Sequence, residues 1–151
     1  GFAKWFLKFS EKIAVKNAHV IVTDNKVIQD YVLLKYKTKT KLIAYGGDHV
    51  QREKISAELI SSFSFLNEKY CFKVCRIEPE NNVKMILDAF SILPNQIIVI
   101  IGNWNNSEYG QKLKDSYSDF SNIFLIDPIY NQQTLNQIRS NSNIYIQKVI
   151  R

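Results

Sequence analysis

Arg76 is the residue whose type and position most clearly suggest chemistry. It follows Cys71–Cys75, an apolar run typical of a buried β-strand, and a helical pattern begins at Asn82. A guanidinium group is a planar, permanently charged fork that binds phosphate oxygens in pairs. The start of a helix adds free N–H groups and a partial positive charge. This combination favours a diphosphate site, while an ion pair from Arg76 to Glu78 or Glu80 in the same loop is an equally open alternative.

A second group of candidate binding residues follows the apolar run Ile97–Ile101. Gly102 has no side chain, so the backbone can approach a ligand closely at this point. Asn103 offers a hydrogen-bond donor and an acceptor in one side chain. The alternative is a turn in which an Asn or Ser caps the next helix, and the residue types favour that alternative.

A third group follows the strand-like run Ile123–Ile126, where Pro128, Ile129 and Tyr130 occur together. In open α/β sheets, ligands bind at the carboxyl ends of the strands. Ile129 and Tyr130 are suited to the flat base of a nucleotide. Burial in the core is the alternative, and for apolar side chains it is the one that we favour from sequence.

These groups lie in a chain in which helix and strand patterns alternate, which predicts βαβ units with parallel sheets and an α/β fold. Apolar residues at helical spacing, or in short runs, give the individual elements. The expected helices are Phe2–Asn17, Val27–Lys35, Gln51–Ser62, Asn82–Leu93, Ser107–Ser116 and Gln132–Ser140. The expected strands are His19–Thr23, Lys41–Tyr45, Cys71–Cys75, Ile97–Ile101, Ile123–Ile126 and Asn143–Ile146.

Gly46 and Gly47 end the second of these strands and form the best candidate for a hinge between two domains, 1–47 and 48–151. With 151 residues and 46% hydrophobic content, the chain can build an ordinary globular core. Cys71 and Cys75 would lie roughly 13 Å apart along a strand, too far for a disulfide. We therefore expect two reduced thiols and no metal site.

The formal net charge of +6 suits an anionic partner, such as a phosphate, an anionic membrane or a nucleic acid. No recognised nucleic-acid-binding motif is present, so no nucleic-acid partner is expected. The sequence contains no dinucleotide-binding glycine motif and no P-loop. We see no signal peptide and no apolar run of the roughly 18 residues that a transmembrane helix needs, so we expect a soluble, cytoplasmic protein.

The expected helix Phe2–Asn17 combines lysines at every fourth position with an aromatic face. Such a helix can lie on an anionic membrane surface. The alternative, which we favour because the following strand needs a packing partner, is an aromatic face packed on its own domain under a solvated lysine face. The residues concerned are Lys4, Lys8, Lys12 and Lys16 and, on the aromatic face, Phe2, Trp5, Phe6 and Phe9.

Several segments together resemble the family-4 glycosyltransferases of the GT-B fold, and most closely a bacterial capsule, O-antigen and rhamnan polysaccharide subgroup that includes rhamnosyltransferases. The most specific segment is Val74–Val83 with Asp88, Ala89 and Phe90, which is similar to the start of the family's donor-binding domain. The supporting segments are Ile43–Asp48, Ile100–Trp104, Ser107–Gly110 and Pro128–Tyr130 with Leu135 and Arg139.

The resemblance implies transfer of a sugar from a nucleotide-sugar donor to a polysaccharide or lipid-linked glycan acceptor, between two Rossmann-like domains and without a metal or other cofactor. It assigns Arg76 to the donor diphosphate, where the family commonly uses an Arg and a Lys. The Lys position falls on Asn82, which can donate a hydrogen bond but brings no charge. The resemblance further implies donor-nucleotide contacts at Gly102, Asn103, Pro128 and Ile129, and a hinge at Gly46 and Gly47.

The resemblance also implies that both domains are incomplete. Residues 1–47 are similar to the end of the acceptor-side domain, and 48–151 to the first part of the donor-nucleotide-binding domain. The family's glycine-rich loop and its pair of glutamates at E-x7-E spacing have no counterpart, and Gln147–Arg151 replaces a His- and Gly-rich segment. We therefore expect a fragment that is inactive alone. Peripheral contact with the inner face of the plasma membrane is the option that the helix Phe2–Asn17 leaves open. A non-catalytic nucleotide- or phosphate-binding module is the alternative.

Overall fold

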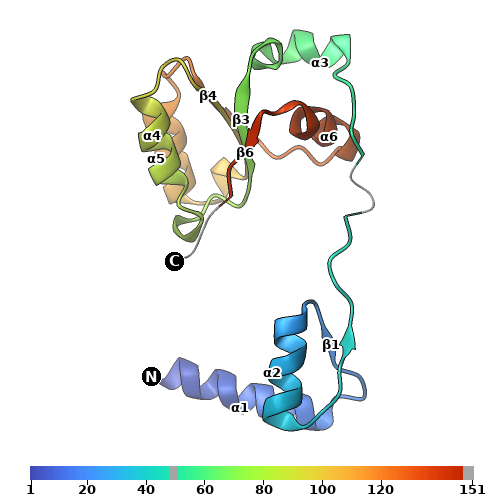
Figure 1. Ribbon diagram of the computed structural model, residues 1–151. Helices are drawn as coiled ribbons and strands as arrows, with labels where there is room; N and C mark the ends of the chain where they lie inside the picture. The colour runs from blue at the N-terminus through green and yellow to red at the C-terminus, as the bar shows by residue number, and fades with distance from the viewer. Residues whose placement is uncertain (48–50, 148–151) are drawn as a thin grey trace. The chain divides into compact units, whose positions relative to one another are not determined.

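A computed structural model describes residues 1–47 and 51–147 of the chain. The chain divides into two compact units, Gly1–His49, here called unit 1, and Val50–Arg151, here called unit 2 (Figure 1). Each unit contains its own sheet, and every described strand pair is parallel. The prediction of an α/β fold with parallel sheets is therefore confirmed.

Gly46 and Gly47, the predicted hinge residues, are exposed and lie just before the division between the units. A Cβ atom added at either position would meet nothing within 4 Å, so no packing contact requires glycine there. Asp48 of the same predicted segment, and residues 148–151 of the predicted tail, lie outside the described residues.

Unit 1 consists of two helices and two short strands. Its elements are α1 (Phe2–Asn17), β1 (Val22–Thr23), α2 (Lys26–Tyr36) and β2 (Lys41–Leu42). Helix α1 has the predicted bounds, whereas both strands are shorter than predicted. Strands β1 and β2 pair only with each other in the described structure, and their ladder spans two residues on each side. No described helix is both long enough and apolar enough to cross a membrane.

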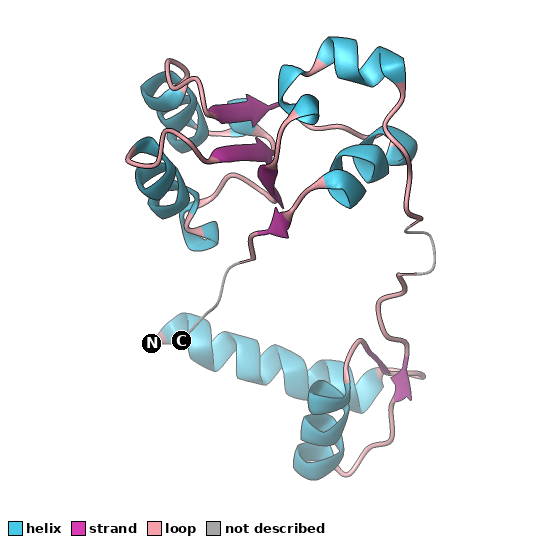
Figure 2. Cartoon of the chain, turned by 45° about the horizontal axis from the view of Figure 1, so that its top comes forward, coloured by secondary structure: helices cyan, strands magenta, loops and turns pink. Residues whose placement is uncertain are grey.

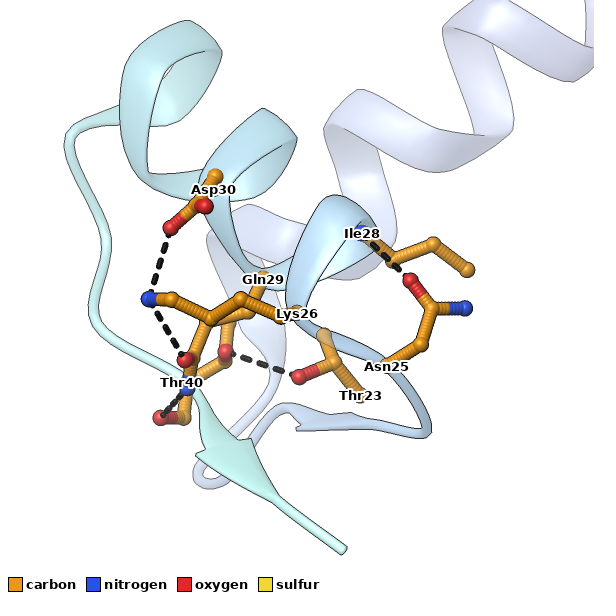
Figure 3. Close-up of polar contacts among 7 residues, drawn as sticks. All are labelled: Thr23, Asn25, Lys26, Ile28, Gln29, Asp30 and Thr40. Carbon is orange, nitrogen blue, oxygen red and sulfur yellow. Dashed lines mark hydrogen bonds and ion pairs between the residues drawn. The ribbon is translucent and has the colours of Figure 1, made fainter. Parts of the chain in front are cut away.

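The turn from β1 into α2 is fixed by polar contacts (Figure 3). The Asn25 side chain accepts a hydrogen bond of 2.9 Å from the Ile28 N–H, which caps the helix. The Thr23 and Thr40 hydroxyls lie 3.2 Å apart, and the Gln29 amide donates to the Thr40 carbonyl at 3.1 Å. These contacts tie the start of α2 to the segment that enters β2.

Apolar packing contributes much less to unit 1. Among its described residues only Thr23 and Val32 are buried, and apolar side chains on both helices and both strands are exposed. Since burial of apolar surface is the main favourable term in folding, unit 1 gains little stability from a core of its own.

Unit 2 is a three-layer arrangement in which helices cover both faces of a four-stranded parallel sheet (Figures 1 and 2). The strand order is β5-β4-β3-β6. Its strands are β3 (Tyr70–Val74), β4 (Ile97–Ile101), β5 (Ile123–Ile126) and β6 (Ile144–Tyr145). Its α-helices are α3 (Ala57–Ser62), α4 (Val83–Ser91), α5 (Glu108–Tyr117) and α6 (Gln132–Asn141), and its short 3-10 helices are η1 (Ser64–Asn67), η2 (Pro79–Asn81) and η3 (Trp104–Asn106).

Strand β4 is the centre of this arrangement. Ile98 and Ile100 face the core under α4 and α5, whereas Val99 and Ile101 face the core under η1 and α6. All four side chains are buried, which confirms that a continuous apolar run predicts a strand covered on both faces. The apolar run is uninterrupted because both faces of β4 are buried from Ile98 to Ile101.

Other element bounds differ from the predictions by small amounts, and α3 differs most. Its predicted helix, Gln51–Ser62, begins only at Ala57, because the Ser56 side chain caps the helix by accepting from the Leu59 N–H at 3.3 Å. The sequence prediction also missed the three 3-10 helices. These are short, and two of them follow strand ends where the chain turns towards a helix.

Strand β3 carries a buried charged residue that the sequence prediction did not single out. Lys73 is buried, and its ammonium donates to the Ile146 carbonyl at 3.3 Å. The two cysteines flank it on the same strand face, are free thiols and pack partly against the core. Burial raises the pKa of both thiols, which keeps them neutral at physiological pH.

The order of the strands determines where a ligand can bind. From β3 the chain adds β4 and β5 on one side, and it then returns to add β6 on the other side of β3. In open α/β sheets, the carboxyl ends of the strands beside such a reversal are the usual ligand site. The carboxyl end of β3 is therefore the place to look for function.

Candidate functional site

A single pocket of about 300 Å³ lies at the carboxyl ends of β3, β4 and β5. It contains five of the residues predicted to bind the donor, contributed by three separate strand ends. Its lining residues are Val74, Cys75 and Arg76 after β3, Ile101, Gly102 and Asn103 after β4, and Pro128, Ile129 and Tyr130 after β5.

Strand register explains why these residues meet. Val74 lies opposite Ile101, which in turn lies opposite Ile126, so the three strands end at the same level. The ladder continues one residue further, where the Cys75 N–H donates to the Ile101 carbonyl at 3.2 Å. The Gly102 N–H likewise donates to the Ile126 carbonyl at 3.0 Å. The loops that follow therefore start from one rigid edge.

Arg76 forms the loop ion pair that was one of the two alternatives left open by its sequence position. Its guanidinium forms an ion pair with Glu78 at 3.5 Å, and its side chain is still 78% exposed. A solvent-exposed ion pair contributes roughly 0–1 kcal/mol. An incoming phosphate can therefore replace Glu78 at small cost, and the ion pair does not exclude the phosphate-binding role.

The loop between β3 and α4 is held by Asn81, which the sequence prediction did not include among the site residues. Its side-chain amide donates to the Arg76 carbonyl at 2.8 Å, and the Glu78 N–H donates to the same carbonyl at 3.1 Å. Asn side chains commonly hydrogen-bond nearby backbone groups in turns, and this tendency could have predicted the role of Asn81 from the sequence. Asn81 therefore positions the backbone of Arg76.

Asn82, predicted to contact the diphosphate, is not among the pocket's lining residues. It lies between η2 and α4 with φ 52 and ψ 32, in the left-handed region, and its side chain makes no helix-capping hydrogen bond. Among residues other than glycine, Asn is one of those that adopt this conformation most readily. The backbone thus gives a structural reason for Asn at this position.

Gly102 lies in the pocket, but the close neighbours that leave no room for a side chain there are other residues of the protein. A Cβ atom there would lie 2.4 Å from Ile77 Cδ1 and 2.6 Å from the Cys75 carbonyl oxygen. Close packing of the β3 and β4 ends therefore explains this glycine without a ligand.

Asn103 is exposed and immediately precedes η3, where its side chain makes no capping hydrogen bond. The capping role that the sequence left open belongs to Ser107, whose hydroxyl accepts from the Gly110 N–H at 3.1 Å. Beside Asn103, Trp104 is fully buried and its indole N–H donates to the Ile126 carbonyl at 3.0 Å. Trp104 therefore anchors the loop that presents Asn103 and is a second positioning residue that the sequence prediction missed.

The two residues predicted after β5, Ile129 and Tyr130, lie in different environments. Ile129 is half-buried and packs against the core under α6, as the favoured prediction expected. Tyr130 is 83% exposed, so the prediction that it belongs to the core is wrong. Its loop leaves the sheet before α6 begins, which removes the side chain from the core and leaves it at the edge of the pocket.

The electrostatics of the pocket favour an anion. Arg76 is the one lysine, arginine, aspartate or glutamate among the pocket-lining residues. The neutral Cys75 thiol adds no negative charge beside it. Within the part of the chain that the structure describes, no three His, Cys, Asp or Glu side chains are grouped so that they could hold a metal ion. The pocket thus offers one cation, one free amide side chain and an exposed aromatic ring.

Comparison with known families concerns unit 1 rather than this pocket. Residues 2–48 match the family model described as "Domain of unknown function (DUF1972)", a domain commonly found in glycosyltransferases. No curated protein and no solved structure matches the chain. The matched segment includes α1, β1, α2 and β2 and ends before unit 2.

Proposed function

We propose that this chain is part of a glycosyltransferase that moves a sugar from a nucleotide-sugar donor to a polysaccharide or lipid-linked glycan acceptor. In this proposal unit 2 binds the donor. The observation that carries it is the convergence of Arg76, Asn103 and Tyr130 on one pocket at the carboxyl ends of three parallel strands. The match of unit 1 to a domain common in glycosyltransferases supports the same function independently.

Arg76 would act on the leaving group. In sugar transfer the bond between the anomeric carbon and the phosphate oxygen breaks, while an acceptor hydroxyl oxygen bonds to that carbon and gives up its proton. Negative charge then grows on the nucleoside diphosphate that departs. The Arg76 guanidinium, carried by a backbone that is held at the edge of the sheet, would stabilise this charge as it develops. Asn81 and the Glu78 N–H hold the Arg76 backbone for this task.

The remaining pocket residues suit the nucleoside. Ile129 and the exposed Tyr130 ring offer an apolar, flat surface for a base, and the free Asn103 amide can hydrogen-bond a ribose hydroxyl or a phosphate oxygen. Within this proposal, the finer assignment is an enzyme of bacterial capsule or O-antigen synthesis, similar to rhamnosyltransferases and working at the cytoplasmic face of the plasma membrane. That assignment rests on the family resemblance of the segment around Arg76.

Calorimetric titration of the chain with UDP, GDP and dTDP tests the proposal. We expect one of these nucleotides to bind, and Arg76→Ala to weaken it by about 10- to 100-fold, as loss of a charge-assisted hydrogen bond of roughly 1.5–3 kcal/mol implies. Lys112→Ala removes an exposed cation that is paired with Glu108 on α5 and is the matched control, with unchanged affinity. Equal affinities for the Arg76 variant and the control would refute the assignment.

The second candidate is a non-catalytic nucleotide- or phosphate-binding module, since the pocket lies within unit 2 alone. Incubation of the chain with a radiolabelled sugar nucleotide and glycan acceptors separates the two functions. Because the resemblance leaves the family's sugar-contacting glutamates without a counterpart, we expect binding without transfer by this chain. Transfer that depends on Arg76 would contradict this expectation and exclude the non-catalytic module.

A further inference from the structure

Helix α1 presents an aromatic stripe that its own unit does not cover. No residue of α1 is buried, and Phe2 and Trp5 are 78% and 60% exposed. The aromatic rings contact one another instead: Trp5 and Phe9 are stacked with centroids 5.5 Å apart, and Phe2 contacts Trp5 and Phe6 at 6.0 and 6.2 Å. The stripe is therefore a continuous apolar surface along the first half of the helix.

The side of α1 that does contact its unit is the opposite one. Glu11 accepts from the Lys35 ammonium of α2 at 3.1 Å, and Glu11 and Val15 are half-buried. At about 100° per residue, Glu11 lies almost diametrically opposite Phe9. The packing of the aromatic face on its own domain, which the sequence favoured, is therefore not what the described residues show.

Lysines of α1 lie next to the aromatic stripe and add positive charge to this surface. Lys12 and Lys16 follow Trp5 and Phe9 at a spacing of seven residues, so they continue the same side of the helix into its second half. Lys4 and Lys8 lie towards the polar side. The one acidic residue of α1, Glu11, is engaged by Lys35.

The net charge of the chain is concentrated in the same unit. Residues 1–49 contain nine lysines against four acidic residues, whereas residues 50–151 contain eleven lysines and arginines against ten acidic residues. Most of the +6 charge thus belongs to unit 1. A partner of unit 1 should be negatively charged over an extended area.

We propose that α1 binds the surface of a membrane that contains anionic phospholipids, and that it lies in the plane of the interface. The aromatic stripe enters the boundary between headgroups and acyl chains, while the lysines reach the lipid phosphates with their flexible stems. At 16 residues the helix is about 24 Å long, shorter than the roughly 30 Å hydrocarbon core. An in-plane orientation fits this length. This site is independent of the nucleotide pocket of unit 2.

Tryptophan fluorescence provides a direct readout, because the chain has two tryptophans in opposite environments. Trp5 is 60% exposed and Trp104 is fully buried. With vesicles of phosphatidylcholine and phosphatidylglycerol in equal amounts, we expect the Trp5 emission to shift to the blue and to become protected from iodide. Trp5→Phe should bind the same vesicles without the shift, which identifies the reporter. An unchanged spectrum of the wild-type chain would overturn the proposal.

A pair of charge variants tests the location of the contact. Lys12→Gln with Lys16→Gln removes two exposed charges from the side of α1 that continues the aromatic stripe, and Lys69→Gln with Lys112→Gln removes two exposed charges from unit 2. The net charges of the variants are equal, and far-UV circular dichroism verifies that both are folded. We expect the α1 variant to bind the anionic vesicles about 30-fold more weakly, at about 1 kcal/mol per lysine, and the unit 2 variant to bind like the wild type.

Three outcomes would refute the proposal. One is equal weakening by both variants, which would indicate a general charge effect. Another is equally tight binding to pure phosphatidylcholine, which would remove the anionic requirement. The third is the absence of vesicle binding together with a dimer in analytical ultracentrifugation that Trp5→Ala dissociates, which would assign the aromatic stripe to a second copy of the chain. None of these outcomes bears on nucleotide binding by unit 2, which the titration of the same samples tests separately.

Discussion

Gly102 and Asn82 are two residues of the predicted site for which the backbone gives a structural reason for the residue type. Gly102 is required by the close approach of the β3 and β4 ends, and Asn82 adopts a left-handed conformation between η2 and α4. Arg76 differs from both, because its side chain is exposed and forms a surface ion pair with Glu78. Of the residues assigned to the diphosphate, Arg76 is the one that lines the pocket, and its side chain is largely exposed there.

Gly102→Ala should destabilise unit 2 by about 1–3 kcal/mol, the usual cost of forcing an extra methyl group into a packed site. The physical reason is the contact of 2.6 Å that the new Cβ would make with the Cys75 carbonyl oxygen. Urea unfolding followed by circular dichroism measures the effect. Gly46→Ala is the control and should be neutral or slightly stabilising, because its Cβ would meet nothing within 4 Å. Normal stability of Gly102→Ala combined with lost nucleotide binding would show that the glycine serves the ligand.

At the scale of elements, hydrogen bonds from side chains to backbone carbonyls fasten the sheet to the segments around it. Trp104 joins η3 to the end of β5, Lys73 joins β3 to the end of β6, and Tyr70 donates to the Ile138 carbonyl of α6 at 2.5 Å. Asn122 does the same at the start of β5, where its amide donates to the carbonyls of Phe90, Leu93 and Gln96 at 2.9–3.1 Å. A polar side chain in the core thus replaces backbone partners that the turns cannot supply.

Tyr70 predicts a dependence of stability on alkaline pH. Burial raises the pKa of its hydroxyl from the usual 10.0 to about 12. The folded chain therefore holds this proton more tightly than the unfolded chain, so the contribution is fully present below pH 10 and is lost as pH rises towards 12. Urea unfolding at pH 7 and pH 11 measures the loss.

The control for this effect is Tyr70→Phe, which should cost about 1 kcal/mol at pH 7 because the Ile138 carbonyl loses its donor. The variant should also show a smaller decrease in stability between pH 7 and pH 11 than the wild type. Tyr130→Phe removes an exposed hydroxyl and should behave like the wild type at both pH values. A decrease as steep in Tyr70→Phe as in the wild type would show that other groups cause it.

At the scale of the whole molecule, the two units differ in how they are stabilised. Unit 2 has two apolar cores, one on each face of its sheet, whereas in the described part of unit 1 only Thr23 and Val32 are buried. The helix N-cap of Asn25 and the contacts of Thr40 hold unit 1 locally, but each such hydrogen bond contributes only about 1 kcal/mol. Local opening should therefore occur more readily in unit 1.

Hydrogen–deuterium exchange measured by mass spectrometry tests this difference. Peptides from residues 2–42 should exchange much faster than peptides from residues 70–101, whose amides lie in or beside the covered sheet. Addition of the anionic vesicles should slow exchange in α1 if the membrane orders this helix, with no change in β4. Protection in α2 and β2 equal to that in β4 would contradict the expected difference between the units.

The sequence by itself determined the types and order of the main elements, because apolar periodicity follows directly from which faces of a helix or strand are buried. Helix α1 and strands β4 and β5 have the predicted bounds, and the parallel α/β fold follows from their alternation. The grouping of Arg76, Gly102 and Ile129 in one pocket was also predictable, since parallel strands bring their carboxyl ends to one edge.

Only the tertiary structure decided what each of these residues contacts. The exposure of Tyr130, the contact of Gly102 with the end of β3 and the bond from Trp104 to Ile126 all join segments that are distant in the sequence. The outward direction of the α1 aromatic stripe depended likewise on where α2 packs. Periodicity along one element states which face is apolar, but the neighbour that covers that face, or leaves it bare, is determined by how the elements pack.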